Sequence, residues 1–263
     1  MVNIFKYRFK VFYKYRFLLQ NLIQRDLKIK YRRSKLGIMW SVLNPLLMMI
    51  VLSMVFSYYF KSDIENYPVY LLSGQLLFTY FTDSTSNAMQ SVIGYAPLIK
   101  KVYVPKYVFP LEKSCFAFIN MCFSLIALCI VMIFTRAPFH LTAVLAVYPL
   151  VTLFFFCLGV GMFLSSAAIF FRDIIHLWTV FTTALMYASA IFYPTSILDN
   201  TPMQFIINLN PLYWYIDAFR QVVLRGEFFS FNHIFICALC AVIAMIVGLK
   251  VFKKGQDSFI LYI

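Results

Sequence analysis

Long runs of apolar residues constrain this chain more than any other feature. A membrane span needs about 20 consecutive, mostly apolar residues. We predict six such spans, with these approximate bounds: 38–60, 69–93, 108–134, 141–171, 174–194 and 231–252. Only 13% of the residues are charged, against about 25% in a typical soluble domain. The chain is therefore predicted to be an all-α integral membrane protein whose surface is covered largely by lipid.

Positive charge is concentrated at the N-terminus, where residues 1–35 carry eleven Lys and Arg and a single acid, Asp26. This stretch leads directly into the first apolar run, which favours an anionic membrane surface over nucleic acid as its partner. On a helical wheel the apolar residues of 19–29 share one side, as in a helix that lies on the inner leaflet. We therefore predict a basic interface segment over 1–35 and a six-span domain over 36–263. Asp26 falls among the apolar positions, so we expect it to pair with an arginine or a helix end.

The distribution of charge also predicts the orientation. Six spans place both termini on one side of the membrane, with nineteen Lys and Arg on that side. The other side holds four: Lys61, Arg136, Arg220 and Arg225. The positive-inside rule then predicts cytoplasmic termini. The leader is too long for a cleavable signal peptide, so the first span is expected to act as an internal signal-anchor.

The second predicted span is unusually polar and contains Asp83. Lipid cannot satisfy its many hydroxyl, amide and carboxyl groups, so its cytoplasmic half must face protein or water. An intramembrane carboxylate marks a functional site by default. A structural hydrogen bond from Asp83 to a neighbouring helix remains the open alternative.

Two connections on the cytoplasmic side have distinct features. Residues 94–107 are basic and contain two prolines, yet they keep several apolar side chains. This mixture indicates a short element that docks on a partner. Only Arg172 and Asp173 separate the fourth and fifth spans, which must therefore meet in a tight turn.

The external segment 194–230 is too apolar for a free loop, and its prolines divide it into pieces too short to span. We predict two short helices that dip into the outer leaflet. The second begins at Asn210, as the capping residue, and stops at Gly226. Asp217 and Arg220 are spaced to pair along it.

Several kinds of chemistry are not indicated. No GxxxxGK[ST] phosphate loop occurs, so ATP is not expected to bind here. The three histidines lie on different segments, and we expect no Ser-His-Asp or Cys-His arrangement. The six cysteines lie in apolar runs, and no metal is predicted. The chain is predicted to be no enzyme and to carry no cofactor.

Aromatic residues make up 19% of the chain. Many lie within the predicted spans instead of at their ends, among them Phe181, Tyr187, Phe192 and Tyr193. Two interpretations remain open: lipid-facing bulk, or a pathway lined by rings that stack on the faces of sugars.

Three stretches together resemble the type 2 ABC exporters of bacterial polysaccharides, which handle O-antigen, capsule and teichoic-acid-like polymers. They are RDLKIKYRRSKLGIMWSVLNPLL (Arg25 to Leu47), IFFRDI (Ile169 to Ile174) and NPLYWYIDAFRQVVLRG (Asn210 to Gly226). Their order and spacing agree over nearly the whole chain. The resemblance implies a homodimeric permease in the bacterial inner membrane, joined to two copies of an ATPase that binds ATP and Mg²⁺ and moving a lipid-linked polysaccharide.

The resemblance also implies roles for residues. The interface and ATPase-coupling set would be Arg25, Asp26, Arg32, Lys100, Lys101, Tyr103, Arg172 and Asp173. The external gate would be Tyr213, Trp214, Asp217 and Arg220. With the aromatic interpretation above, the substrate path would include Asp83, Phe181, Tyr187, Phe192 and Tyr193. A homodimer or a pair of paralogues would both fit, and a type 2 exporter of drugs or lipids and an integral-membrane glycosyl- or acyltransferase remain alternatives.

Overall fold

The computed structural model describes residues 2–32, 34–60, 64, 66–198 and 201–262, and every regular element among them is a helix. The predicted all-α class is therefore confirmed for this part of the chain. Four helical stretches are long and apolar enough to cross a membrane: Gly37–Phe56, Val108–Phe134, Leu141–Phe170 and Phe231–Gly255. They match the first, third, fourth and last predicted spans. Lys61, which entered the charge count, lies outside the described residues.

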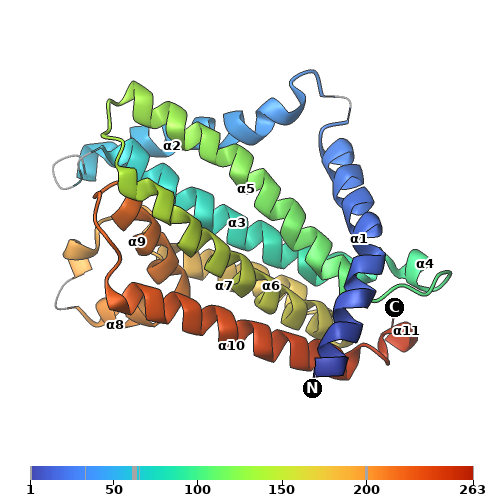
Figure 1. Cartoon of the computed structure of the whole chain (residues 1–263). Coiled ribbons are helices and arrows are strands. Elements are labelled where there is room, and N and C mark those ends of the chain that lie inside the picture. Colours follow the sequence, from blue (N-terminus) through green and yellow to red (C-terminus); the bar gives the residue numbers. More distant parts are fainter. Residues whose placement is uncertain (1, 33, 61–63, 65, 199–200, 263) are drawn as a thin grey trace.

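The long helices lie side by side in one bundle (Figure 1). They are α2 (Trp40–Phe60), α3 (Tyr67–Gly94), α5 (Val108–Phe134), α6 (Val147–Phe170), α7 (Ile174–Tyr187) and α10 (Phe231–Gly255). Both termini lie at one end, with α4 (Ala96–Ile99) and α11 (Phe259–Tyr262). We call this the basic end, because Lys100, Lys101, Lys253 and Lys254 follow or end the helices there. The helices α8 (Pro202–Leu209) and α9 (Pro211–Val223) lie at the opposite end.

The N-terminal helix α1 (Val2–Lys30) crosses the basic end instead of joining the bundle (Figure 1). The predicted apolar side of 19–29 includes Leu22, which is buried in a cluster with Tyr95, Val108 and Phe109. Part of that side therefore packs on the bundle and not on lipid, because the ends of α3 and α5 offer it an apolar surface.

The polar helix α3 occupies the centre of the bundle and packs against α2, α5, α6 and α9. Its 28 residues correspond to about 42 Å at ~1.5 Å per residue, enough to cross a bilayer. Its polar residues keep it out of the apolar set, and its neighbours cover all but one side of it. Burial of most of its side chains within protein explains how so polar a helix is accommodated.

The predicted fifth span is helical only over Ile174–Tyr187, about 21 Å at ~1.5 Å per residue. That is shorter than the ~30 Å hydrocarbon core of a bilayer. The chain then bends through 188–194, where Ala190 has a left-handed φ of +47°. Nothing in the local sequence indicates this bend, since alanine normally favours helix.

The most extensive helix pair, α6 with α10, depends on two glycines. A Cβ on Gly159 would lie 2.3 Å from the Ala244 carbonyl carbon, and one on Gly248 would lie 2.1 Å from the Gly159 carbonyl oxygen. The two backbones therefore touch, as small residues permit between membrane helices.

The helix boundaries at α9 follow the predicted signals. The side chain of Asn210 accepts a hydrogen bond from the backbone N–H of Leu212 at 3.0 Å, so it caps the helix. Beyond its end, Gly226 has a φ of +71°. The predicted start at Asn210 and stop before Gly226 are confirmed.

Candidate functional site

A polar stripe runs along the one side of α3 that its neighbours leave uncovered. Gln75, Thr79, Asp83 and Asn87 recur every fourth residue, so they lie one above the other on a helix. Thr79, Asp83 and Asn87 are exposed, and Gln75 is half-buried. We call these four residues the α3 stripe. No lipid chain can satisfy their hydrogen-bonding groups, so this side of α3 requires water or a polar partner.

Two cavities, of about 350 and 500 Å³, open along the α3 stripe. The first is lined from α2, α3 and α5 and from the residues at the end of α1, and the second from α1, α3 and α5. They share Lys30, Asp83, Ala117 and Asn120, so they adjoin, and we call the two together the groove. The groove places polar groups of four elements around the carboxylate of Asp83.

Asn120 connects three of these elements. Its side-chain oxygen accepts hydrogen bonds from Lys30 Nζ at 3.1 Å and from the Tyr31 hydroxyl at 3.0 Å. The hydroxyl of Ser41, at the start of α2, donates to the same oxygen at 3.4 Å. Its amide nitrogen donates to the Phe116 carbonyl at 2.9 Å. This single amide therefore fixes the junction between α1 and α2 against α5 and lines the groove together with Asp83.

Among the residues that the structure describes, Asp83 makes neither a hydrogen bond nor an ion pair. Lys30 is the charge that acts on it electrostatically. The structural hydrogen bond considered as an alternative is therefore absent from this part of the chain. A carboxylate at this depth that no neighbour satisfies is available to a molecule in the groove.

The aromatic residues predicted for the path lie elsewhere. Phe181 and Tyr187 are exposed on α7, whereas Phe192 is buried and stacks on Phe56 with ring centroids 5.5 Å apart. The hydroxyl of Tyr193 donates to the carbonyl of Tyr187. None of the four lines the groove beside Asp83. The structure thus brings Tyr187, Phe192 and Tyr193 into contact, with the ring centroids of Tyr187 and Phe192 6.2 Å apart, but away from Asp83.

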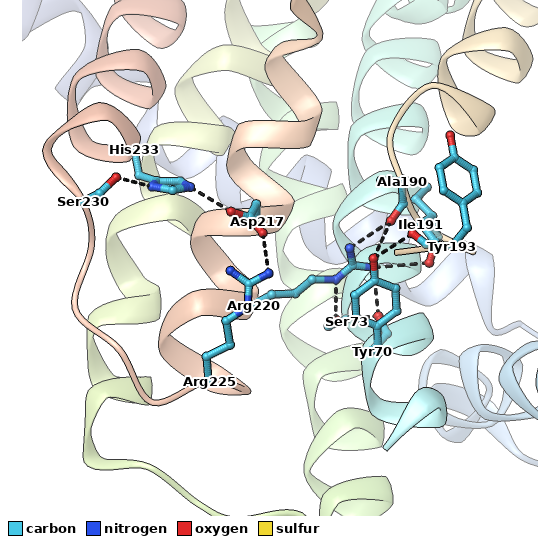
Figure 2. A network of polar contacts seen from close by, with 10 residues as sticks. All are labelled: Tyr70, Ser73, Ala190, Ile191, Tyr193, Asp217, Arg220, Arg225, Ser230 and His233. Atoms are coloured by element: carbon cyan, nitrogen blue, oxygen red, sulfur yellow. Dashed lines mark hydrogen bonds and ion pairs between the residues drawn. The ribbon is translucent and has the colours of Figure 1, made fainter. Parts of the chain in front are cut away.

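A polar network at the opposite end centres on the buried Arg220 of α9 (Figure 2). Its guanidinium donates to the carbonyls of Ala190 at 2.9 Å, Tyr70 at 3.0 Å and Ile191 at 3.3 Å, and to Ser73 Oγ at 3.3 Å. It also lies 3.5 Å from the centroid of the Tyr70 ring, a cation–π distance. Arg220 therefore joins α9 to α3 and to the bend after α7.

The predicted pairing of Asp217 with Arg220 is wrong, because Arg220 is directed at backbone carbonyls. Asp217 instead accepts from Arg225 at 3.0 Å and from the His233 ring at 2.9 Å (Figure 2). These bonds tie α9 to the loop that follows it and to the first turn of α10.

His233 also corrects the expectation that no Ser-His-Asp arrangement would form. Its Nδ1 lies 2.7 Å from Ser230 Oγ, so Ser230, His233 and Asp217 form a hydrogen-bonded chain. Ser230 is the N-terminal capping residue of α10, three residues before His233. Arg225 binds the second carboxylate oxygen of Asp217. We therefore interpret these hydrogen bonds as a structural link between α9 and α10.

Tyr213 and Trp214 lie on α9 with Asp217. Their rings pack edge to face with centroids 5.8 Å apart, and the Trp214 ring lies 5.3 Å from that of His233. The indole N–H donates to the carbonyl of Asn208 on α8 at 2.9 Å. The structure therefore does bring three of the four predicted gate residues together, and Arg220 points away from them into the bundle.

Comparison with known proteins decides the family. Residues 18–224 match the sequence profile of the family described as ABC-2 type transporter. The chain belongs to this family. The O-antigen export system permease protein RfbA of Klebsiella pneumoniae is 28% identical, with 92% of this chain and 93% of the relative covered. A protein of the same name from Myxococcus xanthus is 27% identical, with 94% and 95% covered. The polysialic acid transport protein KpsM of Escherichia coli is 20% identical, with 91% and 93% covered.

ABC-2 permeases are transport components, not enzymes, and they imply an ATPase partner. The basic end of this ABC-2 chain holds the cluster by which α1 docks. Asp26 accepts from Arg25 at 2.7 Å and from Lys113 of α5. Arg25 also donates to the Tyr95 hydroxyl, which in turn donates to Glu112 at 3.3 Å. The expectation that Asp26 pairs with an arginine is confirmed.

The docking cluster shifts two pKa values. Burial alone would raise the pKa of Asp26, but the hydrogen bonds from Lys113 and Arg25 outweigh it and hold this pKa below its usual range. Burial and the neighbouring carboxylates of Glu112 and Asp26 raise the pKa of Tyr95 well above its usual value. Asp26 therefore stays ionised, and Tyr95 stays a hydrogen-bond donor, at neutral pH.

The other predicted coupling residues lie outside this cluster. Lys100, Lys101 and Tyr103 follow α4, and Tyr103 is 91% exposed. Arg172 and Asp173 are exposed in the predicted tight turn between α6 and α7. Arg32 is exposed just beyond α1. These residues face outward at positions where a partner could contact them.

Several residues of these sites were not predicted from the sequence: Lys30, Asn120, Lys113, Tyr70, Ser73 and His233. The only signal for Asn120 was an amide within an otherwise apolar span, and no signal in the sequence linked His233 to Asp217.

Cys237 and Cys240 have C-x-x-C spacing on α10. Among the described residues, however, no group of three or more His, Cys, Asp or Glu side chains could hold a metal.

Proposed function

We propose that this chain is the membrane-spanning subunit of an ATP-driven exporter that moves a lipid-linked polysaccharide out of the cytoplasm. The observation that carries this proposal is the α3 stripe, a continuous polar surface on the central helix of an apolar bundle. A large hydrophilic cargo needs such a surface, because lipid offers no partners for its hydroxyl groups. The names of the curated relatives, O-antigen export and polysialic acid transport, support the same class of cargo.

The proposed topology has six membrane segments. They are α2, α3, α5, α6 with the turn before it, α7 with the bend at 188–194, and α10. The helices α8 and α9 would then be re-entrant gate helices at the external face. The concentration of Lys and Arg at the end that carries both termini supports a cytoplasmic location for that end.

The proposed assembly is a homodimer with two copies of an ATPase subunit, on which ATP and Mg²⁺ act. In it, α1 would lie along the inner surface of the membrane. The turn after α4, with Lys100, Lys101 and Tyr103, would contact the ATPase together with Arg172 and Asp173. The exposure of Tyr103 supports this assignment, since a large ring gains by being covered.

The first test asks which subunit hydrolyses ATP. The purified chain should not hydrolyse ATP, and activity should appear only when the ATPase is added. ATP turnover by the chain alone would contradict the proposal.

A second test addresses the cargo. Deletion of the gene should deplete surface polysaccharide, and an unchanged glycan coat would favour an exporter of drugs or lipids.

A transferase would concentrate its acids at one catalytic centre. The four acids that could serve lie apart: Asp83 in the groove, Glu112 buried beside α1, Asp173 in a turn and Asp217 at the opposite end. Single substitutions should therefore give graded losses of export. Complete loss at one acid alone would favour a transferase.

A further inference from the structure

The groove along the α3 stripe is lined by apolar side chains and by amides and hydroxyls that both donate and accept hydrogen bonds. The amides are those of Asn44, Gln75, Asn87 and Asn120. A sugar hydroxyl likewise donates and accepts, so amides and hydroxyls suit it from either direction. The lining therefore fits a polyhydroxylated unit.

The charges of the groove balance. Among its described lining residues, Lys30 and Lys113 are cationic and Asp26 and Asp83 are anionic. Lys113 is paired with Asp26, and Lys30 donates to Asn120. Asp83 is the one acid of the groove to which the described residues donate no hydrogen bond, and Lys30 makes one hydrogen bond with them out of the three that it can donate. A unit that enters the groove therefore meets no excess of positive charge and one carboxylate without a donor.

We propose that this groove selects electrically neutral, hydroxyl-rich sugar units over anionic ones, and that the carboxylate of Asp83 is the specificity-determining group. This inference rests on the proposed function, since it requires the polymer to pass the groove. An ionised carboxylate can only accept hydrogen bonds, which neutral sugar hydroxyls donate. A uronate or phosphate group brings a second negative charge close to that carboxylate, and like charges repel.

The experiment uses the exporter with its ATPase in cells that lack an exporter of their own. Two lipid-linked polymers are supplied that differ only in one sugar of the repeat, a neutral hexose or the corresponding uronic acid. The readout is the amount of each polymer at the cell surface, normalised to the amount of exporter in the membrane. We expect the wild type to export the neutral polymer at least tenfold better.

Three variants test which residue determines the ratio of neutral to acidic export. Asp83→Asn keeps the shape but removes the charge, and it should lower the ratio of neutral to acidic export at least threefold by raising acidic export. Asn87→Asp adds a carboxylate one turn further along the stripe and should raise the ratio, which keeps the test decisive if Asp83→Asn fails to fold. Asp257→Asn, an exposed acid outside the groove, should leave the ratio unchanged.

The outcomes separate the two proposals. Equal export of both polymers by the wild type would overturn the selectivity and leave the exporter function standing. Asp83→Asn changing both exports by one common factor would show a structural role, for example in a contact with a second copy of the chain, and would also overturn it. Export of neither polymer would overturn the proposed function, and the selectivity with it.

Discussion

Arg220 shows how one side chain can define a local fold that lacks regular structure. Substitution by Met would leave the buried carbonyl of Ile191 without a donor among the described residues and would remove one of the donors to the carbonyls of Tyr70 and Ala190. We expect Arg220→Met to lower the free energy of unfolding by about 3 kcal/mol, since an orphaned buried group costs about 1–3 kcal/mol and the cation–π contact with Tyr70 is lost as well. Arg220→Lys should restore only part of the lost stability, because lysine lacks the planar guanidinium that lies over the Tyr70 ring. Thermal unfolding in detergent measures the loss.

Arg225→Met is the matched control for that variant. Arg225 is about half-exposed and, among the described residues, makes a single ion pair, with Asp217. Such pairs contribute about 1 kcal/mol or less, so this variant should unfold close to the wild type. Equal losses of stability in the two variants would mean that positive charge at this end of the bundle stabilises the bend, and that the hydrogen bonds from Arg220 to the carbonyls do not.

Asp26 determines how the docking of α1 depends on pH. Its pKa is lowered in the folded protein, so its contribution is fully present above its unfolded pKa, about 3.9. The contribution is lost as pH falls through the lower folded value. The distance between labels on α1 and α5 should therefore increase in strong acid, below about pH 4. Asp26→Asn should weaken docking at neutral pH and remove this acid transition, and an unchanged acid transition in the variant would contradict this origin.

At the scale of helices, the α6–α10 contact tolerates no side chain at its crossing point. Gly248→Ala would place a methyl group against the Gly159 carbonyl, and neither backbone can move without separating the helices. We expect a loss of about 1–3 kcal/mol, the usual cost of overpacking, seen as a lower melting temperature in detergent. Gly94→Ala is the control, because its Cβ would meet nothing within 4 Å. Similar melting of both variants would show that the pair has room.

Sequence predicted those elements whose signals are local. The apolar runs gave α5 and α10 nearly to the residue, and Asn210 and Gly226 marked the limits of α9. The end of α7 could not be predicted, because Ala190 is held in its left-handed conformation by Arg220 and Tyr70, residues distant in sequence. Tertiary hydrogen bonds there override local preference.

The candidate sites were predictable to the same extent. Asp83 was recognisable because a carboxylate within a span is costly wherever it lies. Its surroundings were not, since the groove depends on how Asn120 joins α1 and α2 to α5. Likewise, the spacing of Asp217 and Arg220 suggested a pair, but the carbonyls of the bend compete for Arg220 and are visible only in three dimensions.

At the scale of the whole molecule, α1 and the turn after α4 are exposed together at the basic end. We expect a cysteine introduced at Tyr103, in a background without the native cysteines, to crosslink to the ATPase in the assembled exporter. The side chain is almost fully exposed in this chain, so a partner should reach it. A cysteine at Phe139, also exposed but at the opposite end, should give no adduct. An assembled complex with adducts at neither site would move the contact elsewhere.

The α3 stripe makes a prediction about water in the assembled exporter. If the stripe is part of a hydrated path, single cysteines at Thr79, Asp83 and Asn87 should react with a small hydrophilic thiol reagent. Cysteines at Val242 and Ile246, exposed apolar positions on α10, should not react, because lipid covers them and hydrophilic reagents do not enter hydrocarbon. Reaction is followed by the mass added to each variant, with and without ATP.

Two results of that experiment would carry different meanings. Reaction along the stripe that changes with ATP would connect the hydrated surface to the work of the ATPase. Protection of all three positions in every state would mean that a second protein surface covers the stripe, since acyl chains cannot satisfy the unpaired carboxylate of Asp83. The stripe would then be a contact between subunits, and the path would have to run along another face of the bundle.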